Sequence, residues 1–236
     1  MTDPAASIAA DIAASIERRL EGLRRPELIR PLKEWPRAPL PRAGRAASRA
    51  TDTVSSGERS PPRAANAAAA TDAAGAARAA STAKLPVLRW LPQIACDTGA
   101  WAPETVSAVC RSASALAWRQ TYGESEIGRE FLDNYAYTEI MGAKGPLASE
   151  RVACGFLLLG PATHYPRHRH EAEELYVPLS GTASWQQGDS AWRKHAPGTP
   201  IHHASEEPHA MRTGAAPLLA LYLWWNANLG ENARLG

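Results

Sequence analysis

The chain has 236 residues, which is enough for one domain of ordinary size with additional segments and a sizeable buried core. Its net charge of +2 provides no strong field, so the charge balance gives no indication of a nucleic acid or an anionic membrane as partner. The chain has no secretory signal pattern, no apolar run near the roughly 18 residues of a membrane-spanning helix, and an odd number of cysteines without CxxC spacing, so we expect a cytoplasmic protein with free thiols.

Residues 1–44 are expected to form a helix followed by a Pro-rich segment. Asp3 is a suitable N-cap, Pro4 suits the first helical position, and residues 3–24 carry an apolar stripe at helical spacing: Ile8, Ile12, Ile16, Leu20 and Leu23. Four prolines within residues 31–43 prevent the helix from continuing. The helix is expected to pack on the body of the protein or on a second subunit, and a homodimer formed through it is compatible with the sequence.

Residues 45–84 are dominated by Ala, Ser, Thr, Arg and Pro, with no aromatic residue. Such a segment cannot bury enough apolar surface to offset the entropy of ordering it. We therefore interpret it as a flexible linker and place the folded body in residues 85–236.

The body begins with helical patterns and continues with strands. Helices are expected over Pro103–Gln120 and Gly128–Asn134. Short apolar or alternating runs separated by Gly and Pro then predict strands over the following ranges: Tyr135–Met141, Arg151–Leu159, Glu173–Leu179, Thr182–Gln187, Ala191–Lys194, Pro200–Ala204, His209–Thr213 and Leu218–Trp225. Strands of this length and spacing indicate a mainly β sandwich or barrel behind a helical portion.

The most informative stretch runs from Gly160 to Gly181. Four of its side chains are separated by two, four and two residues: His168, His170, Glu174 and Tyr176. Successive side chains of a strand alternate between its faces, so even gaps place all four on one face if the stretch is extended. Two imidazoles and a carboxylate form a ligand set that Zn(II), Fe(II), Mn(II) or Ni(II) accepts, and the phenol would stand beside the ion.

The same stretch resembles the first motif of the cupins, G-x5-HxH-x3,4-E-x6-G. The matching positions are His168-Arg-His170, Glu174 and Gly181, whereas Gly160 lies two residues before the place of the opening glycine. Pro197-Gly198 followed by Pro208-His209 resembles the second cupin motif without its final Asn. The resemblance implies a cupin double-stranded β-barrel with a helical N-terminal extension.

From about Trp118 to Trp225 the chain is similar to one cupin family, the dimethylsulfoniopropionate (DMSP) lyases. The similarity rests on the run from Tyr165 to Tyr176 and on Pro208-His209-Ala-Met-Arg-Thr213. It implies four ligands for a divalent transition metal: His168, His170, Glu174 and His209. It further implies Tyr176 as the catalytic base, Tyr165 as a second tyrosine at the pocket, and Trp224 as a pocket tryptophan.

The reaction of that family requires a metal ion, a base and a site for a cation. Removing a proton next to a carboxylate is difficult, and a divalent ion that neutralises the carboxylate also lowers the pKa of a neighbouring phenol from about 10. The small substrate is a sulfonium carboxylate, and aromatic rings attract its cation, with Trp224, Tyr222 and Trp185 as candidates.

Which tyrosine is the base is open, although strand parity favours Tyr176, because Tyr165 is expected in the loop before the ligands. Two other functions are also open: a cupin dioxygenase or isomerase acting on another small carboxylate, and a non-catalytic ligand-sensing cupin.

Overall fold

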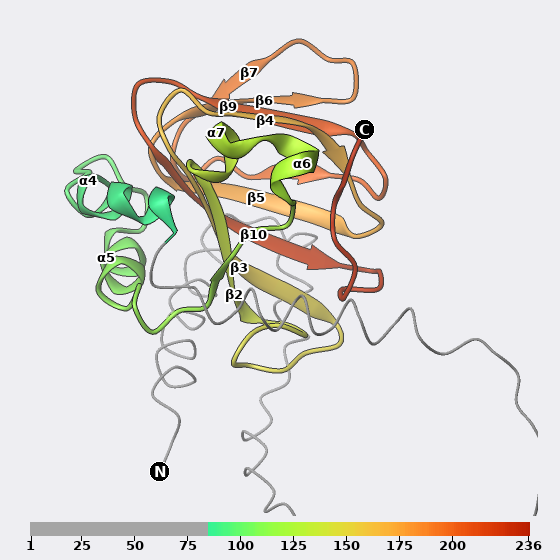
Figure 1. Ribbon diagram of the computed structural model, residues 1–236, viewed down its shortest axis with the longest axis horizontal. Coiled ribbons are helices and arrows are strands. Elements are labelled where there is room, and N and C mark those ends of the chain that lie inside the picture. The colour runs from blue at the N-terminus through green and yellow to red at the C-terminus, as the bar shows by residue number, and fades with distance from the viewer. Residues whose placement is uncertain (1–84) are drawn as a thin grey trace, which may run out of the picture.

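The computed structural model describes residues 85–236, so the expected N-terminal helix and the expected linker lie outside the described residues. Two sheets face each other as a barrel, and short helices lie against it (Figure 1). One sheet has the strand order β1-β2-β3-β10-β5-β8 and is called sheet A here; the other, sheet B, has the order β11-β4-β9-β6-β7. Every pairing between these strands is antiparallel.

The strands have the following bounds: β1 (Trp118–Arg119), β2 (Tyr135–Met141), β3 (Val152–Leu159), β4 (His164–Arg169), β5 (Glu173–Ser180), β6 (Ala183–Gln187), β7 (Arg193–His195), β8 (Ile201–His203), β9 (His209–Thr213), β10 (Leu218–Trp225) and β11 (Arg234–Leu235). The eight strands expected from the sequence all occur, most of them within a residue or two of the expected bounds. The expected fold class, a mainly β cupin barrel preceded by helices, is therefore confirmed.

The helices of the described residues lie before β2 and are short: η2 (Pro86–Trp90), α4 (Leu91–Ala95), α5 (Pro103–Arg111), α6 (Glu124–Ile127) and α7 (Arg129–Leu132). The helix expected to reach Gln120 ends at Arg111, because Trp118 instead pairs with Thr138 as the first strand of sheet A. The second expected helix, Gly128–Asn134, corresponds to α7, and Gly128, whose φ of 84° is incompatible with a continuing helix, separates it from α6.

Sheet A is buried on both faces, which explains the continuous apolar runs of β3 and β10. Alternate residues of β3 enter different cores: Phe156 and Leu158 pack with α4 and α5, whereas Leu157 and Leu159 face the barrel interior. The same alternation in β5 sends Leu175 and Val177 toward the helices and leaves the residues between them for the interior.

The stretch from Gly160 to Gly181 is not one strand, so the prediction of a single extended face is wrong. β4 ends at Arg169 and β5 begins at Glu173, and the chain passes between them from sheet B to sheet A. Parity still holds within each strand, and the two sheets face each other. The histidines and Glu174 therefore meet across the barrel interior instead of along one strand.

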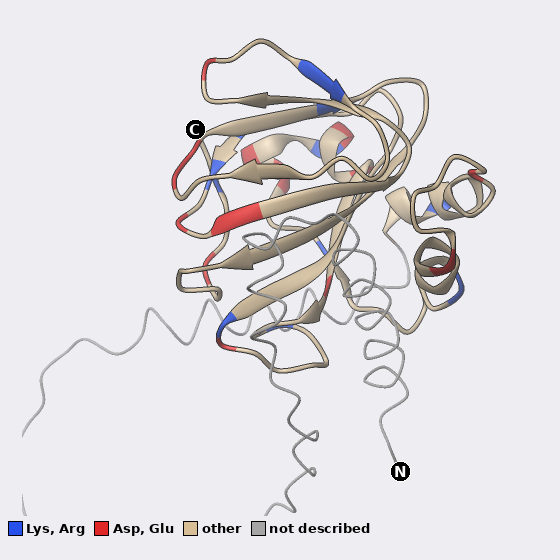
Figure 2. Cartoon of the chain, turned by 180° about the vertical axis from the view of Figure 1, so that it is seen from behind, with Lys and Arg blue, Asp and Glu red and all other residues tan. Residues whose placement is uncertain are grey.

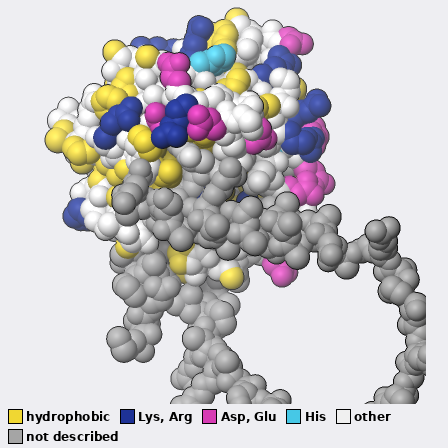
Figure 3. Space-filling model, viewed as in Figure 1, with side chains coloured by type: hydrophobic (Ala, Val, Ile, Leu, Met, Phe, Trp, Pro, Cys, Tyr) yellow, Lys and Arg dark blue, Asp and Glu magenta, His cyan; other side chains and the backbone are white. Residues whose placement is uncertain are grey.

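The charged side chains of the described residues are dispersed. Figure 2 shows segments of Lys and Arg and segments of Asp and Glu scattered over strand ends and loops, and on the face shown in Figure 3 both signs lie next to one another. Among residues 85–236, no helix has the length and apolar character needed to cross a membrane.

Candidate functional site

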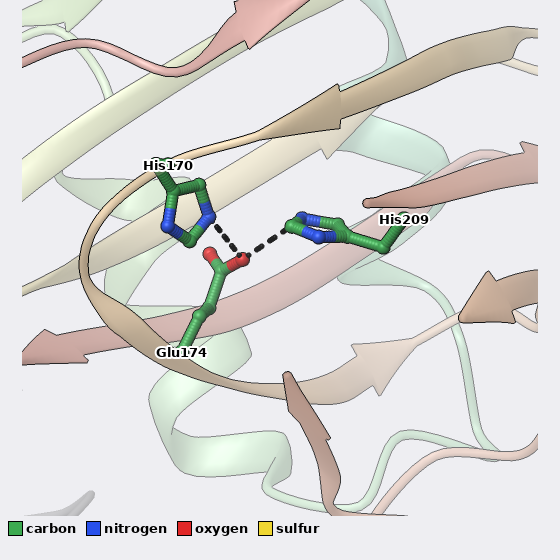
Figure 4. Close-up of side chains that lie close together, drawn as sticks. All are labelled: His170, Glu174 and His209. Atoms are coloured by element: carbon green, nitrogen blue, oxygen red, sulfur yellow. Dashed lines mark hydrogen bonds and ion pairs between the residues drawn. The ribbon is translucent and has the colours of Figure 1, made fainter. Parts of the chain in front are cut away.

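Three side chains meet inside the barrel. His170 follows β4, Glu174 is the second residue of β5, and His209 begins β9. Glu174 Oε2 lies 3.0 Å from His170 Nε2 and 3.2 Å from His209 Nε2 (Figure 4). One ligand atom from each residue lies within 4.8 Å of the others, so the group could hold a metal ion.

The imidazoles are held in one tautomer by the backbone. His170 Nδ1 lies 2.9 Å from the carbonyl oxygen of Ala172, and His209 Nδ1 lies 2.8 Å from that of Glu207. A carbonyl can only accept, so each Nδ1 donates its proton to the backbone, and each Nε2 is left facing Glu174, where it would present its lone pair to a bound ion. This second-sphere arrangement is the usual one around metal-bound histidine.

The electrostatics of the site favour a positive charge beside Glu174. Burial by itself raises the pKa of Glu174, but the adjacent His170 and His209 hold that pKa well below its usual range. For His170, burial lowers the pKa, but Glu174 outweighs it and the net pKa is raised. His209 Nε2 is buried and lies 3.2 Å from Glu174 Oε2 without the geometry of a hydrogen bond. Two nitrogens and a carboxylate with these properties fit a divalent transition metal.

His168, the other expected ligand, lies beside this group but is not one of the three residues whose ligand atoms converge. Its ring centroid is 4.2 Å from that of His209 and 6.5 Å from that of His170. Its Nδ1 also faces a backbone carbonyl, that of Pro166, at 2.9 Å. Burial is the main reason that the pKa of His168 lies well below its usual value, and the neighbouring His209 lowers it further. The ring is therefore neutral, and its Nε2 can act as a metal ligand.

The two expected catalytic tyrosines are both buried in the barrel interior and both line the pocket. Tyr176 follows Glu174 by two residues on the same face of β5. Burial is the main reason that the pKa of Tyr176 lies well above 10, and the negative charge of Glu174 raises it further. Tyr165 belongs to β4, so its expected place in a loop is wrong. Its ring stacks on His168 at 3.9 Å, and its hydroxyl lies 3.0 Å from that of Tyr122.

The three expected aromatic residues occupy different places. Trp224 lies over His170 with a centroid distance of 4.2 Å, and its Nε1 donates to Glu174 Oε1 at 2.6 Å. Tyr222 lines the pocket between Trp224 and Tyr137. Trp185 is fully buried on β6 against Tyr176 and does not line the pocket.

The pocket extends from His168 and Glu174 to the loop after β2 and to the segment after β10. Its lining residues are Thr121, Tyr135, Tyr137, Glu139, Lys144, Leu157, Tyr165, His168, Glu174, Tyr176, Tyr222, Trp224, Leu229, Glu231, Asn232 and Ala233. β11 pairs with Arg169 and His168 of β4 and so holds the C-terminal segment along the rim.

His203 lies beside the site, although the sequence analysis did not single it out. It is completely buried, lies opposite Glu174 on β8, and stacks on His209 with a centroid distance of 4.0 Å. Neither ring nitrogen has a hydrogen-bond partner among the described residues, although Nδ1 lies 3.7 Å from Glu207 Oε2. The alternation of Ile201, His202 and His203 was a signal that His203 faces inward with Ile201.

Comparison with known proteins decides the family. A family model described as dimethylsulfoniopropionate lyase matches residues 58–220. This chain belongs to the DMSP lyase family. The match begins well before Trp118, where the sequence resemblance was expected to begin, and it includes part of the segment interpreted as a linker.

Named members of the DMSP lyase family show the same relationship. The chain is 39% identical over 114 residues to the dimethylsulfoniopropionate lyase DddQ of Ruegeria pomeroyi, which is 48% of this chain and 57% of DddQ. It is 38% identical over 119 residues to DddL of Cereibacter sphaeroides, or 50% of this chain and 49% of DddL. The chain thus spans about half the length of these curated relatives.

Solved structures of DMSP lyases share the fold. The crystal structure of DddQ from Ruegeria pomeroyi superposes with a TM-score of 0.59 and 30% identity, covering 64% of this chain and 77% of that one. A chain from the crystal structures of the DMSP lyases RdDddP and RnDddQII superposes with a TM-score of 0.58 and 31% identity, covering 65% and 78%.

Proposed function

We propose that this chain is a metal-dependent carbon–sulfur lyase that cleaves DMSP into dimethyl sulfide and acrylate by β-elimination. The main support for the proposal is that Tyr176 and Glu174 line the same pocket, and that Glu174 belongs to the group that could hold a metal ion. The chain that carries them belongs to the DMSP lyase family. His170, Glu174 and His209 would hold the ion, and His168, beside them with a free Nε2, would complete the ligand set.

A bound divalent ion would neutralise the substrate carboxylate, which makes the α-proton more acidic, and would lower the pKa of the nearby phenol. The residues of the chain perform the remaining tasks. Tyr176 Oη takes the α-proton, the C–H electron pair becomes the second bond of acrylate, and the C–S pair leaves with sulfur. Dimethyl sulfide departs neutral, so no general acid is required.

The environment of Tyr176 explains why it would work only with a cation present. It is buried and close to Glu174, and both conditions disfavour the phenolate. The hydroxyl of Tyr165 is hydrogen-bonded to that of Tyr122, so Tyr165 is better suited to hold the substrate carboxylate than to remove the α-proton.

Headspace gas chromatography of the metal-loaded full chain incubated with DMSP tests this function. The wild type should release dimethyl sulfide, and Tyr176→Phe should reduce turnover by at least about a hundredfold, because a positioned base contributes about two to four orders of magnitude. Tyr165→Phe is the comparison variant and should lose less. An active Tyr176→Phe beside an inactive Tyr165→Phe would reverse the two roles, and full activity in both would end the phenolate mechanism.

A further inference from the structure

The pocket contains a second buried carboxylate that the proposed elimination does not use, that of Glu139. Glu139 is 5% exposed and lines the same pocket as Glu174 and Tyr176. It lies in one row across sheet A, in which Glu139 pairs with Gly155, Gly155 with Tyr222, and Tyr222 with Tyr176. The row therefore joins the proposed base to this carboxylate along the pocket wall.

Gly155 keeps the row open between Glu139 and Tyr222. A Cβ at this position would come within 1.9 Å of the carbonyl oxygen of Thr138, so only glycine fits. The strands that carry Glu139 and Tyr222 are two spacings apart, or about 10 Å between their backbones. With no side chain between them, the carboxylate and the phenol ring face a common space.

The carboxylate of Glu139 forms no direct ion pair within the described part of the chain, although Lys144 and Arg119 lie near it. Its Oε1 accepts the backbone N–H of Lys144 at 2.5 Å, whereas the Lys144 ammonium group donates to Asn232 at 2.8 Å. No Lys, Arg or His nitrogen of residues 85–236 forms an ion pair with it. Burial raises the pKa of Glu139, and the backbone N–H of Lys144 and the charges of Lys144 and Arg119 counter this only in part, so a ligand cation in the pocket would reduce the cost that remains.

Aromatic rings surround the space in front of Glu139. Tyr137, two residues before Glu139 on the same face of β2, meets Tyr222 edge to face at 6.3 Å. Trp224 follows at 6.2 Å from Tyr222 and reaches the metal ligands. Tyrosine and tryptophan faces attract onium cations, and a carboxylate adds a full opposite charge.

We propose that Glu139, with Tyr137 and Tyr222, binds the cationic end of the substrate and determines specificity for a carboxylate that carries an onium group. This inference rests on the proposed function for the identity of the substrate. The carboxylate end would lie toward Glu174 and the sulfonium toward Glu139. As the C–S bond breaks, sulfur loses its positive charge, so Glu139 stabilises the bound substrate more than the transition state.

Two isosteric ligands isolate the charge: 3-(trimethylammonio)propionate and 4,4-dimethylpentanoate, which differ only in N⁺ against C. Isothermal titration calorimetry on the metal-loaded full chain should give about tenfold or greater preference for the cationic ligand in the wild type. Glu139→Gln should abolish that preference while binding the neutral ligand as the wild type does, which also reports an intact pocket. The Gln side chain retains an oxygen for the Lys144 N–H, and Glu139→Asp should keep a preference.

Glu173→Gln is the matched control, because Glu173 lies on the same sheet but bonds to His202 and Asn226 at the surface. It should retain the full preference. Equal affinity of the wild type for both ligands, or a preference that survives in Glu139→Gln, would overturn the inference. In turnover of DMSP, Glu139→Gln should raise KM about tenfold with kcat unchanged or higher.

The two proposals can fail separately. A wild type that prefers the cationic ligand but releases no dimethyl sulfide would contradict the lyase and leave the subsite in place. A wild type that cleaves DMSP, together with a Glu139→Gln variant that keeps the preference, would contradict the subsite alone.

Discussion

Trp224→Phe should weaken metal binding without removing a metal ligand. The indole Nε1 donates to Glu174 Oε1 at 2.6 Å, and Glu174 is completely buried, so no solvent molecule at the surface can replace the lost donor. A hydrogen bond to a charged group contributes about 1.5–3 kcal/mol, and each 1.4 kcal/mol is about a factor of ten. The metal Kd should therefore rise about 10- to 100-fold, the range known for outer partners of metal ligands.

The assay is competition for Zn(II) against a chromophoric chelator, with Trp225→Phe as the matched control. Trp225 is the next residue of β10 but faces the opposite side, where it stacks on His202. Trp225→Phe should leave the zinc Kd unchanged. A folded Trp224→Phe variant whose Kd stays within about a factor of two of the wild type would show that Glu174 does not depend on this bond.

Two further expectations concern the histidines. His209→Ala should lose most of its bound metal, measured by plasma mass spectrometry, because the three remaining proposed ligands hold a first-row ion much less tightly. Full occupancy would remove His209 from the ligand set, and His168→Ala should show a similar loss. Stability of the metal-free protein should fall as the pH drops below about 6.5, because burial lowers the pKa of His203 to about 2 while the unfolded chain takes up the proton near its ordinary pKa. Between about pH 7 and 5.5, His203 alone should lower the free energy of unfolding, measured with urea, by about 1 kcal/mol. His203→Gln should show a pH dependence smaller by that amount, and an unchanged pH dependence would contradict a buried, neutral His203.

The strands could be predicted from the sequence because their local hydrophobic pattern agrees with their place in the tertiary structure. β3 and β10 are apolar runs bounded by turn residues, and both are central strands of sheet A. The extent of α5 was not readable, because Trp118 gains more by pairing in the sheet and burying its indole than by extending the helix. Tertiary packing overrides propensity at such a boundary.

The site was readable where its residues are close in sequence and form a motif. His170, Glu174 and Tyr176 follow from spacing, and His209 follows from the second motif. Glu139 and Lys144 lie on another strand and its loop, and their place in the pocket depends on sheet order, which spacing cannot supply. The single-face prediction failed for a related reason, since periodicity does not reveal that the chain turns between His170 and Glu174.

The ligand group joins the two halves of the barrel. His170 and His209 belong to strands or strand ends of sheet B, whereas Glu174 belongs to sheet A, so an ion held by all three would cross-link the sheets at the open end of the barrel. Affinity for the ion then appears as resistance of the whole domain to heat, by RT ln(1 + [L]/Kd). A melting curve recorded over a series of free-metal concentrations would thus rank the candidate metals for this protein without any substrate.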